Sequence, residues 1–490
     1  MPNKNLIFLT MARMTDISRR GIYSDLLRKF KCEGWNVYVV SPHERSLGLP
    51  TRLVDLNDNL NLNDNLDLNL DLNLNGKDRG KVYILGVRTL NLQKTSTIEK
   101  GVGQVLVEGQ YKAAIKKYLK GVKFDLITYS TPPITFTNVV KYLKKKNPQA
   151  VAYLQLKDIF PQNAVDLGMM VASPKPSPQG KGLKNAVMAW PKYLLYKYFR
   201  RKEKKLYAVS DFIGCMSPAN VEYVLKHNPE LNGNVNDNVN DNLNLNDNLD
   251  DNLNVNLDLN LNRVEVAPNS VEAPCPPKGE NSESEGEKEL REKNERYYIR
   301  KKYNLPTDRP IFIYGGNLGK PQGIDYLIKC LDAVKGRMDC HFVVVGTGTE
   351  LPKLKAWYDN VNHNDNLNVT VMKGLPKEDY DMLVKYCDVG LIFLDHRFTI
   401  PNYPSRLLSY LENRMPVLCA TDPNTDMGRI AEENGYGYWC ESVKPEDFVA
   451  LVDKMLKADR KEMGEKGYQY LCENYTVENT YNAIVSHLQP

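Results

Sequence analysis

Short apolar runs alternate with longer amphipathic stretches along the first half of the chain and predict β-strands separated by α-helices. Almost every position of these runs is apolar, which is typical of parallel strands that are covered by helices on both faces of a sheet. The runs lie at residues 5–10, 36–41, 81–87, 124–130 and 150–156. We therefore expect a doubly wound α/β domain over residues 1–225.

The same alternation restarts in the second half and predicts another Rossmann-like domain over residues 301–475. Its apolar runs lie at residues 309–316, 341–348, 369–376, 389–395 and 415–422. Residues 226–300 are predicted to form a low-complexity insertion and linker that includes a strand at 263–268. Residues 476–490 are predicted to form a final helix, which could pack back on the first domain.

Two tracts, residues 55–76 and 232–262, alternate Leu or Val with Asn or Asp and interrupt the globular pattern. Their alternation has the period of a strand, but Asn is depleted in strands, so loops or weakly ordered hairpins are favoured over an added sheet ladder. The tracts contain five and six acidic residues and no basic ones, so the formal net charge of +5 becomes +16 for the remaining residues. The globular part is therefore basic.

A basic protein could bind nucleic acid, an anionic membrane or phosphate-bearing substrates, and charge alone does not separate these classes. The tyrosines are spread over predicted strands and helices and form no single stacking platform, so no nucleic-acid partner is expected. The nine cysteines are scattered without a CxxC pair, which excludes a disulfide framework and a zinc site. No run approaches the ~20 apolar residues of a membrane-spanning helix, and we expect a cytoplasmic protein.

The first candidate site is the glycine-rich turn that follows the strand predicted at residues 309–316. Gly316 and Gly319 would let backbone amides approach a diphosphate, and the helix that begins near Gln322 would add its positive N-terminal end. Lys320 could supply a mobile positive charge. An ordinary tight turn between a strand and a helix explains the glycines equally well.

The second candidate site is a predicted helix start at Pro404, Ser405 and Arg406. Ser405 is a good N-cap residue, and the amides behind it would form another anion site. The Arg406 guanidinium is suited to a bidentate contact with phosphate oxygens. A solvated surface arginine is the alternative interpretation.

These segments, taken together and in this order, resemble the family 4 glycosyltransferases, in particular the branch that builds bacterial surface polysaccharides such as capsule, O-antigen or colanic acid. The matching motifs are YSTPPITF, LQLKDIFPQNAVDLG, RVEVAPNSVE, GNLGKPQG, HFVVVGTGTELPKL and YPSRLLSYL followed by MPVL. The resemblance covers nearly the whole chain outside the insertions.

The resemblance implies a GT-B fold, in which two Rossmann-like domains face each other across a cleft. The C-terminal domain would hold a nucleotide-sugar donor, expected to be a UDP-sugar, and the N-terminal domain a glycan or polyprenyl-diphosphate-linked acceptor. It implies a retaining hexosyltransferase that needs no cofactor and no metal ion, because helix ends and cations stabilise the departing diphosphate. The alternative is a non-catalytic or epimerase-type relative that binds sugar nucleotides on the same fold.

The chain departs from the broader family in the diphosphate clamp, in the pair of glutamates and at Arg414, where the family favours Gly. The usual Arg and Lys of the diphosphate clamp fall on Asn317 and Gln322, and the usual pair of glutamates falls on Pro401 and Ser409. The matching branch has Asn in the first of these places and a Pro-Ser-Lys helix start, which makes Arg406 the replacement cation. The expected donor-binding residues are Gly316, Asn317, Gly319, Lys320, Ser405, Arg406, Ser409 and Glu412.

In the first domain, the resemblance assigns Arg19, Arg20 and Gly21 to a loop that faces the acceptor and the donor phosphates, although a basic solvated loop is the alternative. Asp158 matches the branch's acidic residue at the end of a strand, where ligands of α/β sheets bind. It could orient or deprotonate the acceptor hydroxyl as the catalytic residue, or it could cap the following helical turn. His43 matches no motif and is a weaker candidate.

Residues 185–207 combine Trp190, several tyrosines and leucines with a dense cluster of Lys and Arg. This pattern predicts a helix that associates with an anionic membrane surface, which would place the protein peripherally on the inner face of the plasma membrane. A long basic helix that packs on the sheet through its apolar face is the alternative.

Overall fold

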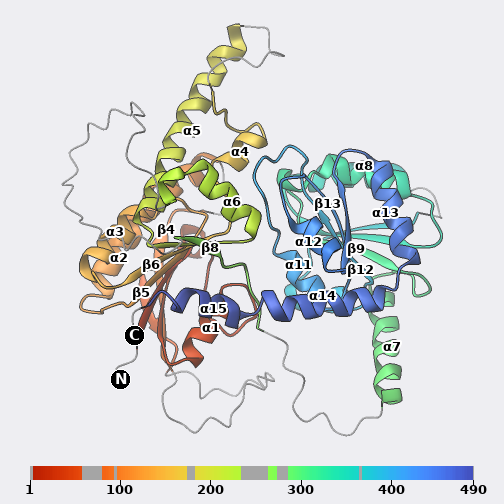
Figure 1. Ribbon diagram of the computed structural model, residues 1–490, viewed down its shortest axis with the longest axis horizontal. Helices are drawn as coiled ribbons and strands as arrows, with labels where there is room; N and C mark the ends of the chain where they lie inside the picture. The colour runs from red at the N-terminus through yellow and green to blue at the C-terminus, as the bar shows by residue number, and fades with distance from the viewer. Residues whose placement is uncertain are drawn as a thin grey trace.

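The chain folds around two separate β-sheets, each covered by helices on both faces, as the computed structural model in Figure 1 shows. The structure describes residues 4–57, 80–92, 97–173, 183–232, 263–272, 285–362 and 367–488. The predicted insertion 55–76 and the Asn-rich tract 232–262 lie almost entirely outside the described residues.

The first sheet has eight strands in the order β3-β4-β2-β1-β5-β6-β7-β8, and only β3 runs antiparallel to its neighbour. Its strands are β1 (Asn5–Leu9), β2 (Asn36–Glu44), β3 (Arg52–Asp55), β4 (Val82–Thr89), β5 (Leu126–Ser130), β6 (Val151–Leu156), β7 (Phe212–Cys215) and β8 (Val264–Val266). The order reverses direction at β1, so the switch point of this sheet lies between β1 and β5. Ligands of open parallel sheets bind at the carboxyl ends of strands beside such a point.

The second sheet has six parallel strands in the order β11-β10-β9-β12-β13-β14. Its strands are β9 (Ile311–Asn317), β10 (His341–Thr347), β11 (Val369–Lys373), β12 (Val389–Phe393), β13 (Val417–Thr421) and β14 (Gly437–Glu441). The switch point lies between β9 and β12, and the glycine-rich turn follows β9 directly.

Each sheet separates two apolar clusters, because successive side chains of a strand point to opposite faces. In β1, Ile7 and Leu9 belong to one cluster, whereas Leu6 and Phe8 belong to the other. The helices of the first domain are α1 (Ser24–Cys32), α2 (Thr97–Tyr118), α3 (Thr137–Lys146), α4 (Gln162–Asp166), α5 (Leu183–Val209) and α6 (Pro218–His227). Because helices cover both faces of each sheet, both sets of side chains are buried, which explains why the strands are apolar at every position.

The helices of the second half are α7 (Glu285–Lys302), α8 (Ile324–Val334), α9 (Leu351–Val361), α10 (Lys377–Lys385), α11 (Arg406–Glu412), α12 (Met427–Glu433), α13 (Pro445–Lys457), α14 (Arg460–Asn474) and α15 (Val477–Val485). α7 is largely exposed and ends the region that the sequence predicts as linker. None of the helices in these described segments combines the length and hydrophobicity that crossing a bilayer requires.

The chain crosses between the domains twice, and the two crossings are hydrogen-bonded to each other. Val271 on the outward crossing forms a parallel bridge with Thr476 on the return, through Val271 N to Tyr475 O (3.0 Å) and Val477 N to Val271 O (3.0 Å). Beyond this bridge, α15 packs on α1, and its Val477 and Ile484 join the apolar cluster of the first domain. The last helix therefore belongs structurally to the domain in which the chain begins.

Segments that follow the carboxyl ends of both sheets meet at the domain junction. Phe398 and Ile400, which follow β12, belong to the apolar cluster of the first domain. Asp166 at the end of α4 accepts hydrogen bonds from the backbone N–H (2.8 Å) and hydroxyl (2.9 Å) of Thr399. The carboxyl edges of the two sheets therefore face the same junction.

Candidate active site

The turn after β9 depends on glycines at two positions. Gly316 has φ +118° and Gly323 has φ +58°, both in the region that favours glycine. A Cβ at Gly323 would also lie 3.2 Å from the Asp395 Cα of the neighbouring strand end. The turn is thus held close to the sheet before α8 begins at Ile324, after a short 3₁₀ turn at residues 320–322.

Asn317 and Gln322, which stand where the family has cations, are bonded to each other. The buried Gln322 Oε1 accepts hydrogen bonds from Gly319 N–H (3.1 Å) and from Asn317 Nδ2 (3.2 Å). These two amides therefore brace the turn, while the neighbouring Lys320 is exposed. Any positive charge at this turn must come from Lys320 or from another segment.

Arg406, the first residue of α11, supplies a positive charge from another segment. Its guanidinium lies against the ring of Tyr314, with Cζ 4.3 Å from the ring centroid, and a Cβ added to Gly316 would be 3.9 Å from Cζ and Nη2. Its Nη1 is buried without a hydrogen-bond partner in the described structure. Because arginine stays charged, the arrangement leaves a positive donor at the turn without a protein acceptor.

Tyr314 fixes this arrangement from two sides. Its ring supports the Arg406 guanidinium, and its hydroxyl donates to the carbonyl of Asn317 (2.8 Å). The sequence analysis did not single out Tyr314, because a tyrosine inside an apolar strand is typical of the core. Its position directly before the Gly315–Gly316 pair was the available signal.

The other residues predicted around α11 have different environments. Ser405 stands at the N-cap position, but its side chain makes no capping hydrogen bond, so the expected cap is not formed and its hydroxyl is exposed. Ser409 is half-buried. Pro401 is buried, and its carbonyl accepts a hydrogen bond from Asn220 of the first domain. Neither Pro401 nor Ser409 brings a carboxylate to the site.

Glu412 and Arg20, predicted on opposite sides of the cleft, form an ion pair with each other. Arg20 Nη2 lies 2.6 Å from Glu412 Oε1, and the side chains are 50% and 17% exposed. Burial raises the pKa of Glu412 above its usual value, and the Arg20 charge works against this rise. The two residues therefore join the domains in this arrangement.

Arg28 of α1 holds the loop of Arg19, Arg20 and Gly21 in place. The Arg28 guanidinium donates to the carbonyls of Ile17, Ser18 (3.1 Å) and Arg19 (3.1 Å). It also bonds both carboxylate oxygens of Glu272 in the outward domain crossing, at 2.7 and 2.8 Å. The Arg19 side chain itself is exposed. The loop is therefore rigidly attached where the chain leaves the first domain.

Asp158 lies just beyond β6 on the carboxyl edge of the first sheet. Its backbone N–H donates to Thr131 Oγ1 (3.1 Å), and its carboxylate has no hydrogen-bond partner among the described residues. Burial raises the pKa of the Asp158 carboxyl to about 6. α4 begins after Pro161 without a side-chain cap, so Asp158 does not cap it. A carboxylate that titrates near neutrality is suited to accept a proton.

Lys157 is a second titratable group at this edge, which the sequence analysis did not single out. Burial lowers the pKa of its ammonium to about 7, and its backbone N–H shares Thr131 Oγ1 with Asp158 (2.9 Å). Shifts of this size cluster at functional sites. The adjacent Lys157 and Asp158 in the motif LQLKDIFP were the signal for this site in the sequence.

One short loop connects the two halves of the site. Arg20 contacts Glu412 at the end of α11, Ile22 packs on the apolar cluster of the second domain, and Tyr23 lies near Asp158. Burial raises the pKa of Tyr23, and the Asp158 charge adds to the rise. Four successive residues therefore link the helix of Arg406 with the candidate base.

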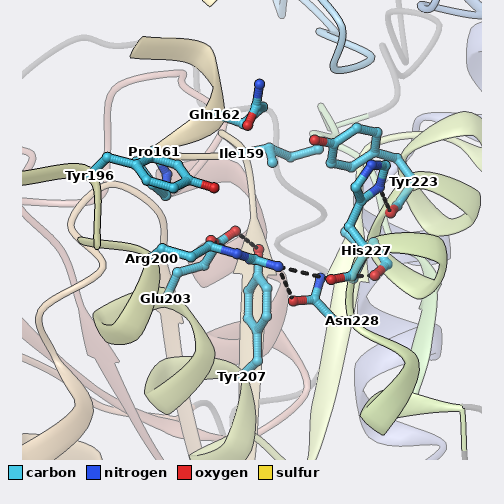
Figure 2. A pocket seen from close by; sticks show the side chains of 11 residues that line it. Ile159, Pro161, Gln162, Tyr196, Arg200, Glu203, Tyr207, Tyr223, His227 and Asn228 are labelled. Atoms are coloured by element: carbon cyan, nitrogen blue, oxygen red, sulfur yellow. Dashed lines mark hydrogen bonds and ion pairs between the residues drawn. The ribbon is translucent and has the colours of Figure 1, made fainter. Parts of the chain in front are cut away.

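Two other features lie outside this site. His43 is buried against Gly86 of β4, and its Nδ1 is 3.0 Å from the Pro50 carbonyl, so it is part of the packing. Figure 2 shows a cavity of about 70 Å³ between α5 and α6, where Arg200 bonds Glu203 (2.5 Å) and Asn228 (2.9 Å). It is too small for a nucleotide sugar.

Residues 295–470 match the family described as "Glycosyl transferases group 1". The match covers the second domain, and the resemblance to glycosyltransferases that the motifs carry is confirmed there.

Two relatives that match are named as glycosyltransferases, and the name of one refers to colanic acid biosynthesis. "Probable glycosyltransferase WbjE" of Pseudomonas aeruginosa is 23% identical over 175 residues, which are 35% of this chain and 43% of the relative. "Putative colanic acid biosynthesis glycosyl transferase WcaI" of Escherichia coli is 25% identical over 157 residues, which are 31% of this chain and 36% of the relative. The matches span less than half the length of either relative.

The solved structure of WaaG, a glycosyltransferase involved in lipopolysaccharide biosynthesis, superimposes with a TM-score of 0.51 at 12% identity. The superposition covers 98% of this chain and 99% of WaaG. At this identity the comparison shows the fold alone. Together with the two parallel sheets, it confirms the predicted GT-B class.

Proposed function

We propose that the protein is a retaining glycosyltransferase that moves a hexose from a nucleotide sugar, a UDP-sugar, to a glycan or polyprenyl-diphosphate-linked glycan in cell-surface polysaccharide synthesis. The observation that carries the proposal is the Arg406 guanidinium, held on Tyr314 beside Gly316 with its Nη1 unpartnered. A buried cation without a counterion is costly, and a diphosphate would supply the missing acceptors.

In this proposal the second domain stabilises the leaving group. As the glycosidic bond to the diphosphate breaks, negative charge develops on the phosphate oxygens, and a fixed cation lowers the energy of that state more than that of the bound donor. The Gly316–Gly319 turn, with Lys320 at its exposed end, lets the phosphates approach the backbone. In this proposal these cations and the helix start stabilise the departing diphosphate in place of a metal ion, so we expect EDTA to leave the rate unchanged.

The first domain would supply acceptor activation. Asp158 has a free carboxylate and a pKa of about 6, so it is largely deprotonated near pH 7 and can orient or deprotonate an acceptor hydroxyl. The Arg20 loop that connects it to α11 would close over the phosphates. Use of a nucleotide sugar would place the enzyme in the cytoplasm, and use of a lipid-linked acceptor would place it at the inner face of the plasma membrane.

The name of WcaI supports the polysaccharide context, and the name of WbjE and the group 1 match of residues 295–470 support the class of reaction. Thermal unfolding with UDP, GDP and ADP tests the donor site. A rise in melting temperature with UDP alone would support the proposal, and no shift with any of the three would overturn it. Turnover of a UDP-sugar without acceptor, by hydrolysis or isomerisation, would favour the epimerase-type alternative.

A further inference from the structure

Helix α5 exposes an apolar face that the proposed active site does not use. Only its last part is packed on the first domain, where Glu203, Leu206 and Tyr207 are buried. The earlier part rises clear of the domain in Figure 1. Four large apolar side chains are 40–59% exposed there, namely Trp190, Leu194, Leu195 and Tyr198. A cluster of exposed apolar side chains of this size marks an interaction surface.

The exposed side chains share one side of the helix. Trp190, Leu194 and Tyr198 follow one another at intervals of four residues and form a row along it. Lys197 and Lys202 stand beside this row, and the Lys202 ammonium lies 5.7 Å from the ring centroid of Tyr198. Apolar side chains and long basic side chains are thus interleaved on one surface.

The neighbouring segment extends this surface. Lys192 Nζ donates to the carbonyl of Gly168 (3.2 Å), which brings residues 168–169 beside α5. Met169 is also largely exposed. The apolar face therefore comprises residues from two segments.

The charge of this region has a single sign. Residues 189–202, the described part of α5 that carries the exposed row, contain five Lys or Arg and no Asp or Glu. The first acidic residue after them, Glu203, is buried and paired with Arg200. The face therefore carries positive charge that no acidic side chain of the same segment offsets.

Helix α7 provides an internal comparison. It exposes Leu290, Tyr297 and Tyr298 by 57–67%, so its apolar exposure is at least as large. Its residues 285–302, however, include five glutamates among seven basic residues. Exposed apolar side chains occur on both helices, but residues 189–202 of α5 contain basic and no acidic residues, whereas α7 contains both.

We propose that the exposed face of α5, defined by Trp190, Leu194, Leu195, Tyr198, Lys197 and Lys202, docks on a bilayer that contains anionic phospholipids. The aromatic and leucine side chains enter the boundary between headgroups and acyl chains, and the lysines remain among the lipid phosphates. A second copy of the chain does not fit this face, because two such faces would repel each other. The inference does not rest on the proposed function, because vesicle binding needs no donor and no transfer.

Flotation of the full chain with vesicles tests the docking, using phosphatidylcholine alone and phosphatidylcholine mixed with phosphatidylglycerol. We expect binding to the anionic vesicles that weakens as salt rises, and little binding to neutral ones. Lys197→Ser and Lys202→Ser should each weaken binding about fivefold. The triple variant Trp190→Ser, Leu194→Ser, Tyr198→Ser should weaken it more than about tenfold.

The matched control is the triple variant Leu290→Ser, Tyr297→Ser, Tyr298→Ser in α7, which removes a similar exposed area and should bind as the unaltered chain does. Lys202 is half-buried and the other altered side chains are exposed, and an unchanged melting temperature verifies that each variant folds. Equal binding to neutral and anionic vesicles, no binding to either, or an equal loss in the α7 control would each overturn the proposal. So would a dimer that the α5 variant converts to monomer without lipid.

Discussion

The two sides of the junction are stabilised in different ways. On the second domain, Arg406, Tyr314 and the Asn317–Gln322 pair form a site from contacts within that domain. On the first domain, the Arg20 loop is held by Glu272 in the domain crossing and by Glu412 of the other domain. The donor half is therefore pre-formed, whereas the acceptor half depends on how the domains are joined.

This difference predicts that the second domain alone determines donor binding, while substitutions on the first domain change the rate and the closure of the cleft. Breaking a contact inside the second domain should affect both donor affinity and turnover. Breaking a contact between the domains should leave donor affinity nearly unchanged. The following substitutions separate these cases.

The largest effect is expected for Arg406→Ala, which removes the cation from the pre-formed half. We expect kcat/KM to fall on the order of 10³-fold, because the charge on the departing diphosphate loses its main stabilising group. The thermal shift with UDP should disappear as well. Donor titration and steady-state kinetics measure the two effects.

Two variants control this prediction. Arg406→Lys keeps the charge but loses the planar guanidinium that lies on Tyr314, so it should recover only part of the rate. Arg429→Ala removes an exposed arginine that pairs with Glu433 on α12, and it should leave both measurements unchanged. A normal rate in Arg406→Ala would contradict the assigned role.

Asp158→Asn addresses the other half and should lower the rate about 10²-fold while leaving the UDP thermal shift intact. The unaltered enzyme should gain activity as pH rises through about 6, where burial places the pKa of Asp158. The variant should lose this inflection. A full rate at saturating acceptor would contradict the proposed base.

The same pKa predicts the sign of a stability effect. The folded-state pKa of Asp158, about 6, lies above the ordinary value of 3.8 for an aspartate, so the folded chain binds more protons between these values. The favourable contribution of the protonated carboxyl is therefore lost as pH rises from about 4 to about 6. Above pH 6, Asp158→Asn should melt at the same temperature as the unaltered chain or higher.

Gln322→Ala should have a smaller effect, confined to the pre-formed half. It leaves the buried N–H of Gly319 without an acceptor, at a cost of about 1–3 kcal/mol in the free energy of unfolding. Gln322→Glu keeps an acceptor oxygen but adds a negative charge beside the phosphates. The Glu variant should therefore be more stable than the Ala variant and bind UDP less well, by denaturant unfolding and donor titration.

The smallest effect is expected for the Arg20–Glu412 pair that joins the halves. Arg20→Ala, Glu412→Gln and the double variant form a thermodynamic cycle, and the coupling free energy should be about 0.5 kcal/mol because Arg20 is half-exposed. Solution scattering should show the cleft more open in each variant. An unchanged radius of gyration would show that other junction contacts hold the domains.

The strands and the second domain's turn were predictable, because they depend on local patterns. Ten strands of the structure overlap the apolar runs seen in the sequence, and β8 falls on the strand predicted at 263–268. The GNLGKPQG motif marked the turn that lies beside Arg406. The short strands β3, β7 and β14 were missed. β7, for example, has only four residues, too few for a reliable period.

The pairings across the junction could not be predicted, because they join residues that are far apart in sequence. Arg20 and Glu412 were assigned separately to phosphate and donor binding, and nothing local indicates that they meet across 392 positions. The Asn317–Gln322 pair was interpreted as a loss of charge. The structure shows what these residues do instead, since Gln322 closes the turn.

The bridge between Val271 and Thr476 has a consequence for engineering. Because α15 returns to pack on α1, the donor half is an insert within the other half and not a terminal module. A chimaera that exchanges donor halves between homologous enzymes therefore needs two junctions, one near each partner of this bridge. A single-junction fusion would also replace α15 with a helix unmatched to α1.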